Sequence, residues 1–353
     1  MSDALRVLIT GATGLVGAHV VARLLKDPSR WRVRALVRTP SRLGKALKPF
    51  QANTGALDVC EGDVADAKSV ESAVRGCDAV VHAAGIFSHD TRDRPLMQRT
   101  NVEGTRLVLA AAHGAGVDPI VYVSSYLALF PPRGAVQSAE DPVTHPRGAY
   151  ARTKADAERI ARGLQRRQVP VVCLYPGAIH GPYDPSFGAS PAYIAASICS
   201  REMLVNRAGR TYMDVRDLAE LVVRTLQRGL GPRRIMCGGN YVSDADVHAL
   251  LRELTGRDIR PRRIPGSILR LIGRLGDAWR VVSGREPQLT YEAACVVTRS
   301  VPCDDRDALA LLGRPYIDFR ESLQDLLAWM VAAGRLSQEE AGPALVARAE
   351  KFS

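Results

Sequence analysis

The sequence predicts an α/β fold with a doubly wound parallel sheet and a smaller, mostly helical lobe. Apolar runs of strand length alternate with amphipathic stretches through the first half of the chain. The runs are rich in Val and Ile without polar alternation, which indicates a sheet covered on both faces. The regular βαβ alternation indicates that the strands are parallel.

Seven apolar runs are predicted as strands of this sheet. They are 6–10, 33–37, 57–63, 78–85, 120–125, 171–177 and, later in the chain, 233–239. The predicted helices between them are a first one ending at Leu25, then 66–75, 102–114, 150–167 and 214–228.

After residue 177 the alternation of strands and helices gives way to a Gly/Pro-interrupted loop, and 243–349 is predicted to be mostly helical. We therefore expect a large domain of residues 1–177 plus 213–240 and a smaller lobe of 178–212 plus 241–335. Residues 336–353 are expected to form a C-terminal helical tail. A cleft between the two parts is the expected place for a small-molecule substrate.

Composition excludes several classes of protein. The 353 residues are 46% hydrophobic and 24% charged, as in a globular chain. The net charge of +11 is spread along helices beside 37 acidic residues, with no nucleic-acid recognition motif, so we expect no nucleic-acid partner. No signal peptide or membrane-spanning apolar run is evident, and a cytoplasmic protein is expected.

No metal or disulfide site is expected. The seven cysteines are scattered without a C-x-x-C pair. The nearest approach to a metal motif is His82 with His89 and Asp90, which lacks the spacing of a ligand set. A hydrogen-bonded or solvent-exposed histidine is the favoured interpretation at each position.

A glycine-rich turn lies between the first predicted strand and helix. Thr10 to Gly17 reads T-G-A-T-G-L-V-G, with the glycines spaced G-x-x-G-x-x-G. Glycine permits a tight turn and a close approach of the backbone to a pyrophosphate, and the helix N-terminus supplies N–H groups. We therefore expect a dinucleotide, contacted here by Gly11, Thr13, Gly14, Leu15, Val16 and Gly17.

The end of the second predicted strand favours NADP over NAD. An NAD site usually has an acidic residue there for the ribose 2′-hydroxyl, whereas a 2′-phosphate prefers arginine. From Arg30 to Lys48, both included, there is no acid and there are seven basic residues. Arg38 follows the strand directly and is the predicted phosphate ligand, with a share for Arg42 or Lys45 left open.

Tyr150 and Lys154 are four residues apart at the start of a predicted helix. This spacing puts the phenol and the ammonium on one helix face. A nearby cation stabilises a phenolate, so we expect the pKa of the phenol to be lowered.

The ordered motifs of the chain resemble those of the extended short-chain dehydrogenase/reductases. They are "TGATGLVG", "GDVAD" (62–66), "HAAG" (82–85), "NVEGT" (101–105), "YVSS" (122–125), "YARTK" (150–154), "YPGAIHGP" (175–182) and "VRDLA" (215–219). The chain is most similar to the branch of dihydroflavonol reductases, 3β-hydroxysteroid dehydrogenases and hopanoid-associated sugar epimerases. The similarity extends through 238–257 and 284–294 and implies a Rossmann domain for the large part.

The resemblance implies roles for individual residues. Tyr150 and Lys154 match the catalytic Y-x-x-x-K pair, and Ser125 matches the third catalytic member. Its neighbour Ser124 is implied to contact the cofactor, although the choice between the two serines depends on the alignment. Asn101 matches a helix position that supports the site, with a simple helix cap as the alternative. The remaining implied cofactor contacts are Asp63 and Val64 at the adenine, Ala83, Ala84 and Gly85 beneath the cofactor, and Pro176, Gly177 and Ile179 beside the nicotinamide.

The expected reaction is reduction of a ketone, or oxidation of the alcohol, on a hydrophobic small molecule. Tyr150 would exchange the proton, Lys154 would stabilise its phenolate and Ser125 would bond the carbonyl oxygen. Residues 126–129 read Tyr-Leu-Ala-Leu where sugar dehydratases of the family have acids, and Phe87 would also contact the substrate. The alternatives are a nucleotide-sugar epimerase with tightly bound NAD(P) and a non-catalytic NADP(H)-sensing protein.

Two interaction surfaces are suggested beyond the site. In 264–284, apolar residues form one helical stripe, with arginines elsewhere on the helix. Packing on a neighbouring domain is the favoured interpretation of this stripe, and peripheral contact with an anionic membrane is the alternative. The resemblance also suggests a homodimer through the helices at about 102–114 and 150–167.

Overall fold

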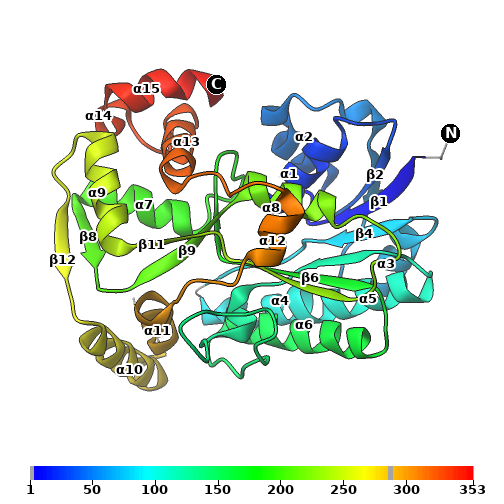
Figure 1. The fold of residues 1–353 in the computed structure, drawn as a ribbon, viewed down its shortest axis with the longest axis horizontal. Helices are drawn as coiled ribbons and strands as arrows, with labels where there is room; N and C mark the ends of the chain where they lie inside the picture. The colour runs from blue at the N-terminus through cyan, green and yellow to red at the C-terminus, as the bar shows by residue number, and fades with distance from the viewer. Residues whose placement is uncertain (1–3, 89, 285–288, 353) are drawn as a thin grey trace.

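The computed structural model describes residues 4–88, 90–284 and 289–352. Its centre is a seven-stranded sheet in the order β10-β6-β5-β4-β1-β2-β3, with every pairing parallel (Figure 1). The order turns back between β1 and β4, which is the switch point where ligands bind in doubly wound sheets. The predicted fold class is confirmed.

All seven predicted strands are present in this sheet. They are β1 (Leu5–Thr10), β2 (Trp31–Val37), β3 (Asp58–Glu61), β4 (Ala79–His82), β5 (Ile120–Val123), β6 (Val171–Pro176) and β10 (Arg233–Cys237). Several end earlier than predicted, because "AAG" after β4 and "SS" after β5 leave the sheet at its carboxyl edge.

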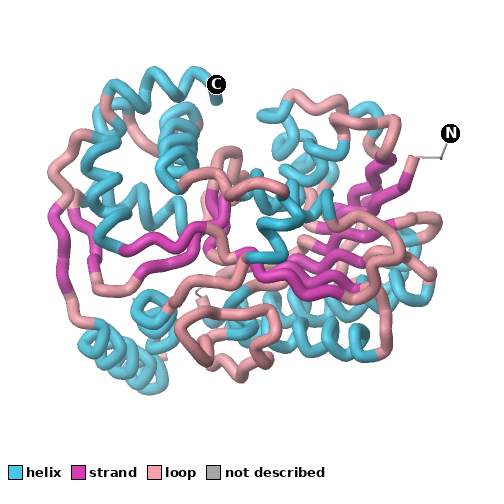
Figure 2. Tube along the Cα trace, viewed as in Figure 1, coloured by secondary structure: helices cyan, strands magenta, loops and turns pink. Residues whose placement is uncertain are grey.

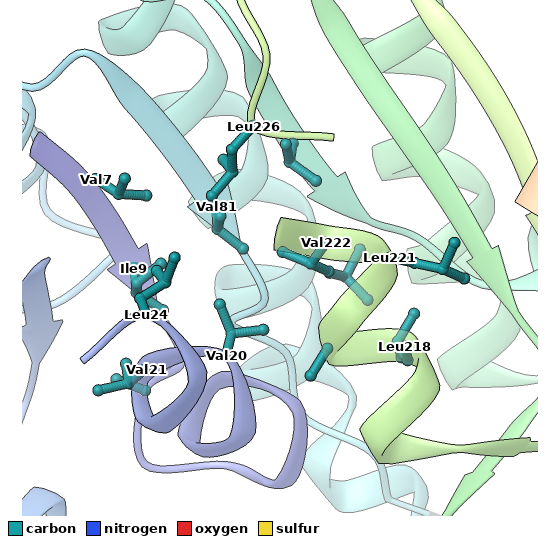
Figure 3. Close-up of a cluster of buried hydrophobic side chains, with 14 of the residues drawn as sticks. Val7, Ile9, Val20, Val21, Leu24, Val81, Leu218, Leu221, Val222 and Leu226 are labelled. Carbon is teal, nitrogen blue, oxygen red and sulfur yellow. The ribbon is translucent and has the colours of Figure 1, made fainter. Parts of the chain in front are cut away.

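Helices cover both faces, as the continuous apolar strands require. On one face lie α1 (Leu15–Leu24), α2 (Pro40–Leu47), α8 (Val215–Arg224) and α12 (Arg306–Leu312). On the other lie α3 (Ala67–Val74), α5 (Gly104–Gly114) and α6 (Ala149–Arg166). Val7 and Ile9 of β1 enter the first core with side chains of α1 and α8 (Figure 3), while Leu8 enters the second.

The smaller lobe is assembled around two short sheets. One pairs β7 (Ala178–His180) and β11 (Asn240–Ser243) with β9 (Gly209–Asp214), and the other pairs β8 (Glu202–Val205) with β12 (Arg260–Arg263). Figure 2 shows this second pair at the outer edge of the lobe. The lobe's helices are α7 (Ala189–Ser200), α9 (Asp244–Thr255), α10 (Gly266–Ser283), α11 (Tyr291–Arg299), α13 (Phe319–Ala332), α14 (Gln338–Ala341) and α15 (Pro343–Ala349).

A third core holds most of this lobe together. Side chains of α7, α9 and α13 share it with Leu336, Ala341 and Leu345 of the predicted C-terminal tail. Helix α12 falls within the predicted smaller lobe but packs on α8 and β10 of the large sheet. Among the helices within the described ranges, none is long and apolar enough to cross a membrane.

Candidate active site

The glycine-rich turn between β1 and α1 is shaped by close backbone contacts. Gly11 has φ +75°, and a Cβ there would lie 2.6 Å from the backbone of Ala83 and Ala84. A Cβ at Gly17 would lie 2.2 Å from the Gly11 carbonyl oxygen. Helix α1 starts behind Gly14 without a side-chain cap, so its first N–H groups face the turn. A backbone cradle of this kind fits a pyrophosphate.

A cavity of about 670 Å³ lies at the carboxyl ends of β1 to β4. It brings together many of the predicted cofactor residues, namely Gly11, Thr13, Gly14, Arg38, Asp63, Val64, Ala83, Ala84 and Gly85, with Arg42 and Lys45. The other predicted contacts do not line it. Leu15, Val16 and Gly17 are in α1, Ser124 follows β5, Tyr150 and Lys154 are in α6, and Pro176, Gly177 and Ile179 are at β6 and β7.

Some lining residues were not predicted. Thr100 reaches the cavity from the turn before α5, and Pro185 and Ser186 reach it from the loop after β7. That loop carries no periodic pattern, and its approach to the groove depends on how the smaller lobe folds. The sequence therefore held no signal for Pro185 and Ser186.

The end of the cavity near β2 is basic. Arg38 follows β2, and Arg42 and Lys45 are on α2. Asp63 is the one acid among the lining residues of the described chain, and its carboxylate is paired with Arg99 at 3.1 Å. It also accepts a hydrogen bond from the Ala65 N–H at 3.0 Å.

Lys154 is buried behind Gly85, one of the residues that line this cavity. Its Nζ donates to the Val123 carbonyl oxygen of β5 at 3.1 Å and lies 3.8 Å from where a Gly85 Cβ would stand. Burial lowers the pKa of Lys154 to about 8, although the Glu158 carboxylate acts in the opposite direction. The ammonium therefore lies between the end of β5 and the cavity wall at Gly85.

Tyr150 lies one helical turn before Lys154. Its ring packs edge-on against Phe87, with the ring centroids 4.7 Å apart. Burial raises the pKa of Tyr150 to about 12, so the expected lowering by Lys154 is not found in this state of the protein. The Tyr150 hydroxyl makes no hydrogen bond to Lys154 or Ser125, whose side chains bond elsewhere.

The two neighbouring serines have different surroundings. Ser124 donates to the buried Glu158 carboxylate at 2.7 Å, which turns its hydroxyl into the protein interior. Ser125 Oγ accepts from the Leu127 N–H at 3.2 Å at the start of a short 3₁₀ turn, Tyr126–Leu129. The Ser125 hydroxyl hydrogen is therefore available to an acceptor in the site.

Asn101 ties the loop after β4 to α6. Its side chain accepts from the Ile86 N–H at 2.8 Å and donates to the Ile86 carbonyl at 2.9 Å and to Thr153 Oγ1 at 3.0 Å. Asn101 lies in a π-helical turn, Gln98–Glu103, a feature frequent at functional sites. Its predicted alternative, a helix cap, does not match this position inside the helix.

His82 is a structural residue beneath the site. Its ring nitrogens bond to Thr10 Oγ1 at 2.7 Å and to Thr105 Oγ1 at 2.9 Å. Burial lowers the pKa of His82 to about 3, with a further contribution from Lys154. His89 lies outside the described residues, and no group of side chains within the described ones could hold a metal ion.

Glu158 continues the line of Tyr150 and Lys154 on the next turn of α6. It is fully buried, accepts from Tyr175 at 2.6 Å and Ser124, and pairs with Arg162 at 3.0 Å. This carboxylate was not predicted as part of the site. Its spacing of four residues from Lys154 is the signal that could have found it.

Comparisons with known proteins agree with this geometry. The family model described as "NAD dependent epimerase/dehydratase family" matches residues 7–238. A "Putative dihydroflavonol 4-reductase" of Synechocystis is 28% identical, with 91% of this chain and 93% of the relative covered. A "4-hydroxy-2-methyl-3-oxo-4-farnesyl-3,4-dihydroquinoline-1-oxide ketoreductase" of Stigmatella aurantiaca is 30% identical, with 88% and 91% covered.

Solved structures show the same fold over nearly the whole chain. The crystal structure of gox2253 superposes with a TM-score of 0.78 at 26% identity, covering 95% of this chain and all of that one. UDP-glucuronic acid 4-epimerase from Bacillus cereus, at 18% identity and 92% coverage of this chain (99% of that one), superposes with a TM-score of 0.72. The chain belongs to the NAD dependent epimerase/dehydratase family and is an NAD(P)-dependent oxidoreductase of the extended short-chain dehydrogenase/reductase type.

Proposed function

We propose that this enzyme reduces a ketone on a hydrophobic small molecule with NADPH, or oxidises the corresponding alcohol. The observation that carries the proposal is the position of Lys154. Its buried ammonium lies beside Gly85, a residue of the cavity wall, and one helical turn from Tyr150. The nicotinamide end of a cofactor in the cavity and a substrate at Tyr150 would then both lie next to the Lys154 ammonium.

The groove has the features that a nicotinamide dinucleotide requires. The turn around Gly11 and Gly17 has no room for a Cβ, and the uncapped start of α1 faces it, as a pyrophosphate would need. Asp63 and Val64 would hold the adenine. Arg38, with Arg42 and Lys45 nearby, would bind a ribose 2′-phosphate, which supports NADP as the preferred cofactor.

The proton chemistry fits reduction. The bound cofactor would supply hydride to the carbonyl carbon. Tyr150, whose pKa of about 12 keeps it protonated at neutral pH, would give its phenolic proton to the carbonyl oxygen. Ser125 would donate a hydrogen bond to the same oxygen, and Lys154 would stabilise the phenolate that Tyr150 becomes.

The surroundings of Tyr150 favour an apolar substrate. The Phe87 ring packs on Tyr150 and is itself 46% exposed, so that it presents apolar surface next to the reacting hydroxyl. The name of the ketoreductase from Stigmatella aurantiaca describes a substrate with a farnesyl group. A "Sterol demethylase protein B" of Methylococcus capsulatus is 28% identical over nearly its whole length. Both names support a lipid-like ketone.

The test is turnover of Tyr150→Phe. We expect NADPH oxidation with a panel of hydrophobic ketones to fall by about 100-fold or more, because the general acid is lost. NADPH affinity, measured by fluorescence titration, should stay within about twofold, since the ring remains. Tyr241→Phe is the matched control. The Tyr241 hydroxyl accepts from the Gly209 N–H at 3.0 Å and donates to the Ser300 carbonyl at 3.3 Å, both in the smaller lobe, so its loss should leave turnover at the wild-type level.

Two alternatives give different results in the same experiment. A nucleotide-sugar epimerase would copurify with its cofactor and interconvert UDP-sugars without net NADPH consumption. An NADP(H)-sensing protein would bind cofactor but show no turnover in wild type or variant. Equal turnover in Tyr150→Phe and wild type would contradict the proposed role of Tyr150.

A further inference from the structure

Helix α10 carries a stripe of exposed apolar side chains. Leu275, Trp279 and Val282 are 63%, 59% and 84% exposed, and Ile268, Leu271 and Ile272 are also exposed. At about 100° per residue these six side chains fall within an arc of about 100° on one side of the helix. Burial of an apolar stripe is the usual fate of such a helix face, so this one requires an explanation.

The opposite side of α10 is the side that packs on the protein. Leu269 is buried, and a Cβ at Gly273 would lie 2.7 Å from the Thr290 carbonyl oxygen at the start of α11. Figure 1 shows α10 at the lower edge of the smaller lobe, with α11 between it and the large domain. The expected packing of the stripe on a neighbouring domain is therefore not found within the described chain.

A basic cavity adjoins the N-terminal end of α10. It has a volume of about 1060 Å³ and is lined by Arg207, Arg263 and Arg270, with no acidic residue among its lining side chains. Arg263 ends strand β12, whose residues are all exposed and include Arg260 and Arg262. Within the described residues, Arg207 and Arg263 form no ion pair with an acid.

We propose that α10 and this cavity dock the enzyme on an anionic lipid bilayer. The apolar stripe would enter the interface between headgroups and acyl chains, with Trp279 at the level that its amphipathic ring favours. Arg207 and Arg263, which are exposed, would bind the phosphates of anionic headgroups. Arg270 lies on the packed side of α10 and bonds to Thr298 Oγ1 at 2.9 Å. The proposal concerns a surface distant from Tyr150 and does not depend on the reaction assigned above.

Charge favours a bilayer over a second copy of this chain. A symmetric dimer through α10 would bring two positively charged copies together, with the exposed arginines of β12, which directly precedes α10, on both. An anionic membrane surface instead neutralises these charges, and the chain as a whole carries a net charge of +11.

The experiment is vesicle co-sedimentation of the full chain. We expect binding to phosphatidylcholine vesicles that contain phosphatidylglycerol, little binding to pure phosphatidylcholine, and weaker binding as salt is raised. Trp31 and Trp329 are buried, so Trp279 should dominate a blue shift of the emission on binding. Trp279→Phe should still bind and should lose that shift.

Two variants test the parts of the surface separately. Leu275→Glu with Trp279→Glu should weaken binding at least about tenfold, since two anchoring side chains become anionic. Leu230→Glu is the matched control. Leu230 lies outside this surface and is 44% exposed, the same as Ile272 of the stripe, so it introduces a glutamate at an equally exposed apolar position. Arg207→Glu with Arg263→Glu should remove the preference for phosphatidylglycerol, whereas Arg133→Glu, at an exposed loop, should not.

Three outcomes would overturn the proposal. They are equal sedimentation with and without anionic lipid, unchanged binding of the Leu275→Glu/Trp279→Glu variant, and self-association through α10 without lipid. The last would appear in analytical ultracentrifugation as an oligomer that the same variant converts to monomer. NADPH-dependent turnover of a water-soluble ketone should be the same in all these variants, which separates this test from the test of Tyr150.

Discussion

Lys154 is both buried and charged, a combination that is usually unfavourable because burial removes water from the ammonium. Its ammonium has one direct hydrogen-bond acceptor, the Val123 carbonyl, and gains support from the Glu158 carboxylate one turn later. With a pKa of about 8, the side chain is cationic at neutral pH and loses its charge within a readily accessible pH range. Tyr150, by contrast, stays protonated throughout that range.

This difference predicts how ketone reduction depends on pH. Because the Lys154 pKa lies at about 8, kcat/KM should be constant below that pH and should fall as pH rises through it. The fall should follow the loss of one proton. Lys154→Arg, which keeps its charge at high pH, should flatten this alkaline limb in whatever activity remains. A wild-type profile that is flat or rising between about pH 7 and 9.5 would contradict the assignment.

Arg38 gives a second prediction for a single residue. Arg38→Ala should weaken NADPH binding by about 10-fold or more and leave NADH binding nearly unchanged, because only NADPH carries the 2′-phosphate. Arg32→Ala is the control, since Arg32 is an exposed arginine of the same strand β2 that does not line the cavity. An equal loss of affinity for NADPH and NADH, measured by fluorescence titration, would show that Arg38 does not bind the 2′-phosphate.

Among the elements, α6 does most to organise the site. Tyr150, Lys154 and Glu158 occupy successive turns, and Glu158 ties the helix to Ser124 of the neighbouring loop and to Tyr175 of β6. The start of α6 is also fixed from the smaller lobe, because the Gly148 N–H donates to the Glu292 carboxylate of α11. Helix α6 is thus held from both parts of the molecule.

The sequence predicted the large sheet well and the smaller lobe less completely. Strand β6 is an unbroken apolar run and β1 contains one from Val7 to Ile9, and their flanking helices carry a clear apolar stripe, so both signals are local. Strand β7 has three residues and β12 reads Arg-Pro-Arg-Arg, and neither has a periodic pattern. Their pairing depends on contacts made only once the lobe has folded.

The contrast between local signals and contacts formed only on folding also applies to the site. Gly11, Arg38 and Asp63 follow strands directly, and adjacent parallel strands bring their carboxyl ends together, so their meeting could be predicted. Pro185 in the groove and Glu292 at Gly148 come from segments far along the chain. The high pKa of Tyr150 was also missed, because it results from burial rather than from sequence spacing.

The turn from β1 to α1 gives a prediction for a single structural element. In Gly17→Ala the new methyl would overlap the Gly11 carbonyl oxygen and the Ala12 Cα, at 2.2 and 2.9 Å. We expect a loss of about 1–3 kcal/mol in the free energy of unfolding, as in other overpacked sites, together with weaker cofactor binding. Urea unfolding and NADPH titration measure the two effects.

Gly163→Ala is the control for this variant. Gly163 lies in the interior of α6, and its added Cβ would meet only the Arg166 side chain, at 3.8 Å. Because alanine is the better helix former, this change should stabilise the protein by about 0.5–1 kcal/mol. Equal effects of the two substitutions would show that the turn has more room than the structure indicates.

At the scale of the whole molecule, the two parts are joined by a buried polar network. Arg216 of α8 binds Asp214 and also Asp325 of α13, which in turn pairs with Arg348 of α15. Asp214 accepts a further hydrogen bond from Ser322 of α13 at 2.5 Å. Each charge is matched, which is the condition under which buried ion pairs are tolerated. The helices of the C-terminal region are thereby fixed to the large domain.

Two buried histidines lie at this junction. The His180 ring stacks on Phe319 and bonds to Ser322, and the His19 ring of α1 contacts Phe50 edge-on, with centroids 4.7 Å apart. Burial lowers the pKa of each ring to about 4. Neither His19 nitrogen has a hydrogen-bond partner in the described structure. Folding therefore keeps both rings neutral.

These histidines predict that mild acid weakens the fold. In the unfolded chain each ring takes up a proton near pH 6.5, whereas in the folded protein it does so only near pH 4. The unfolded state thus binds more protons between these values, so stability is complete above about pH 6.5 and falls as the pH approaches 4. Each histidine contributes at most about 3 kcal/mol to this loss. The urea midpoint of His19→Leu should depend less on pH across this window than that of wild type, and His113→Gln, at an exposed position of α5, should behave as wild type. A His19→Leu variant with the full acid dependence would show that protonation of His19 does not contribute to the loss.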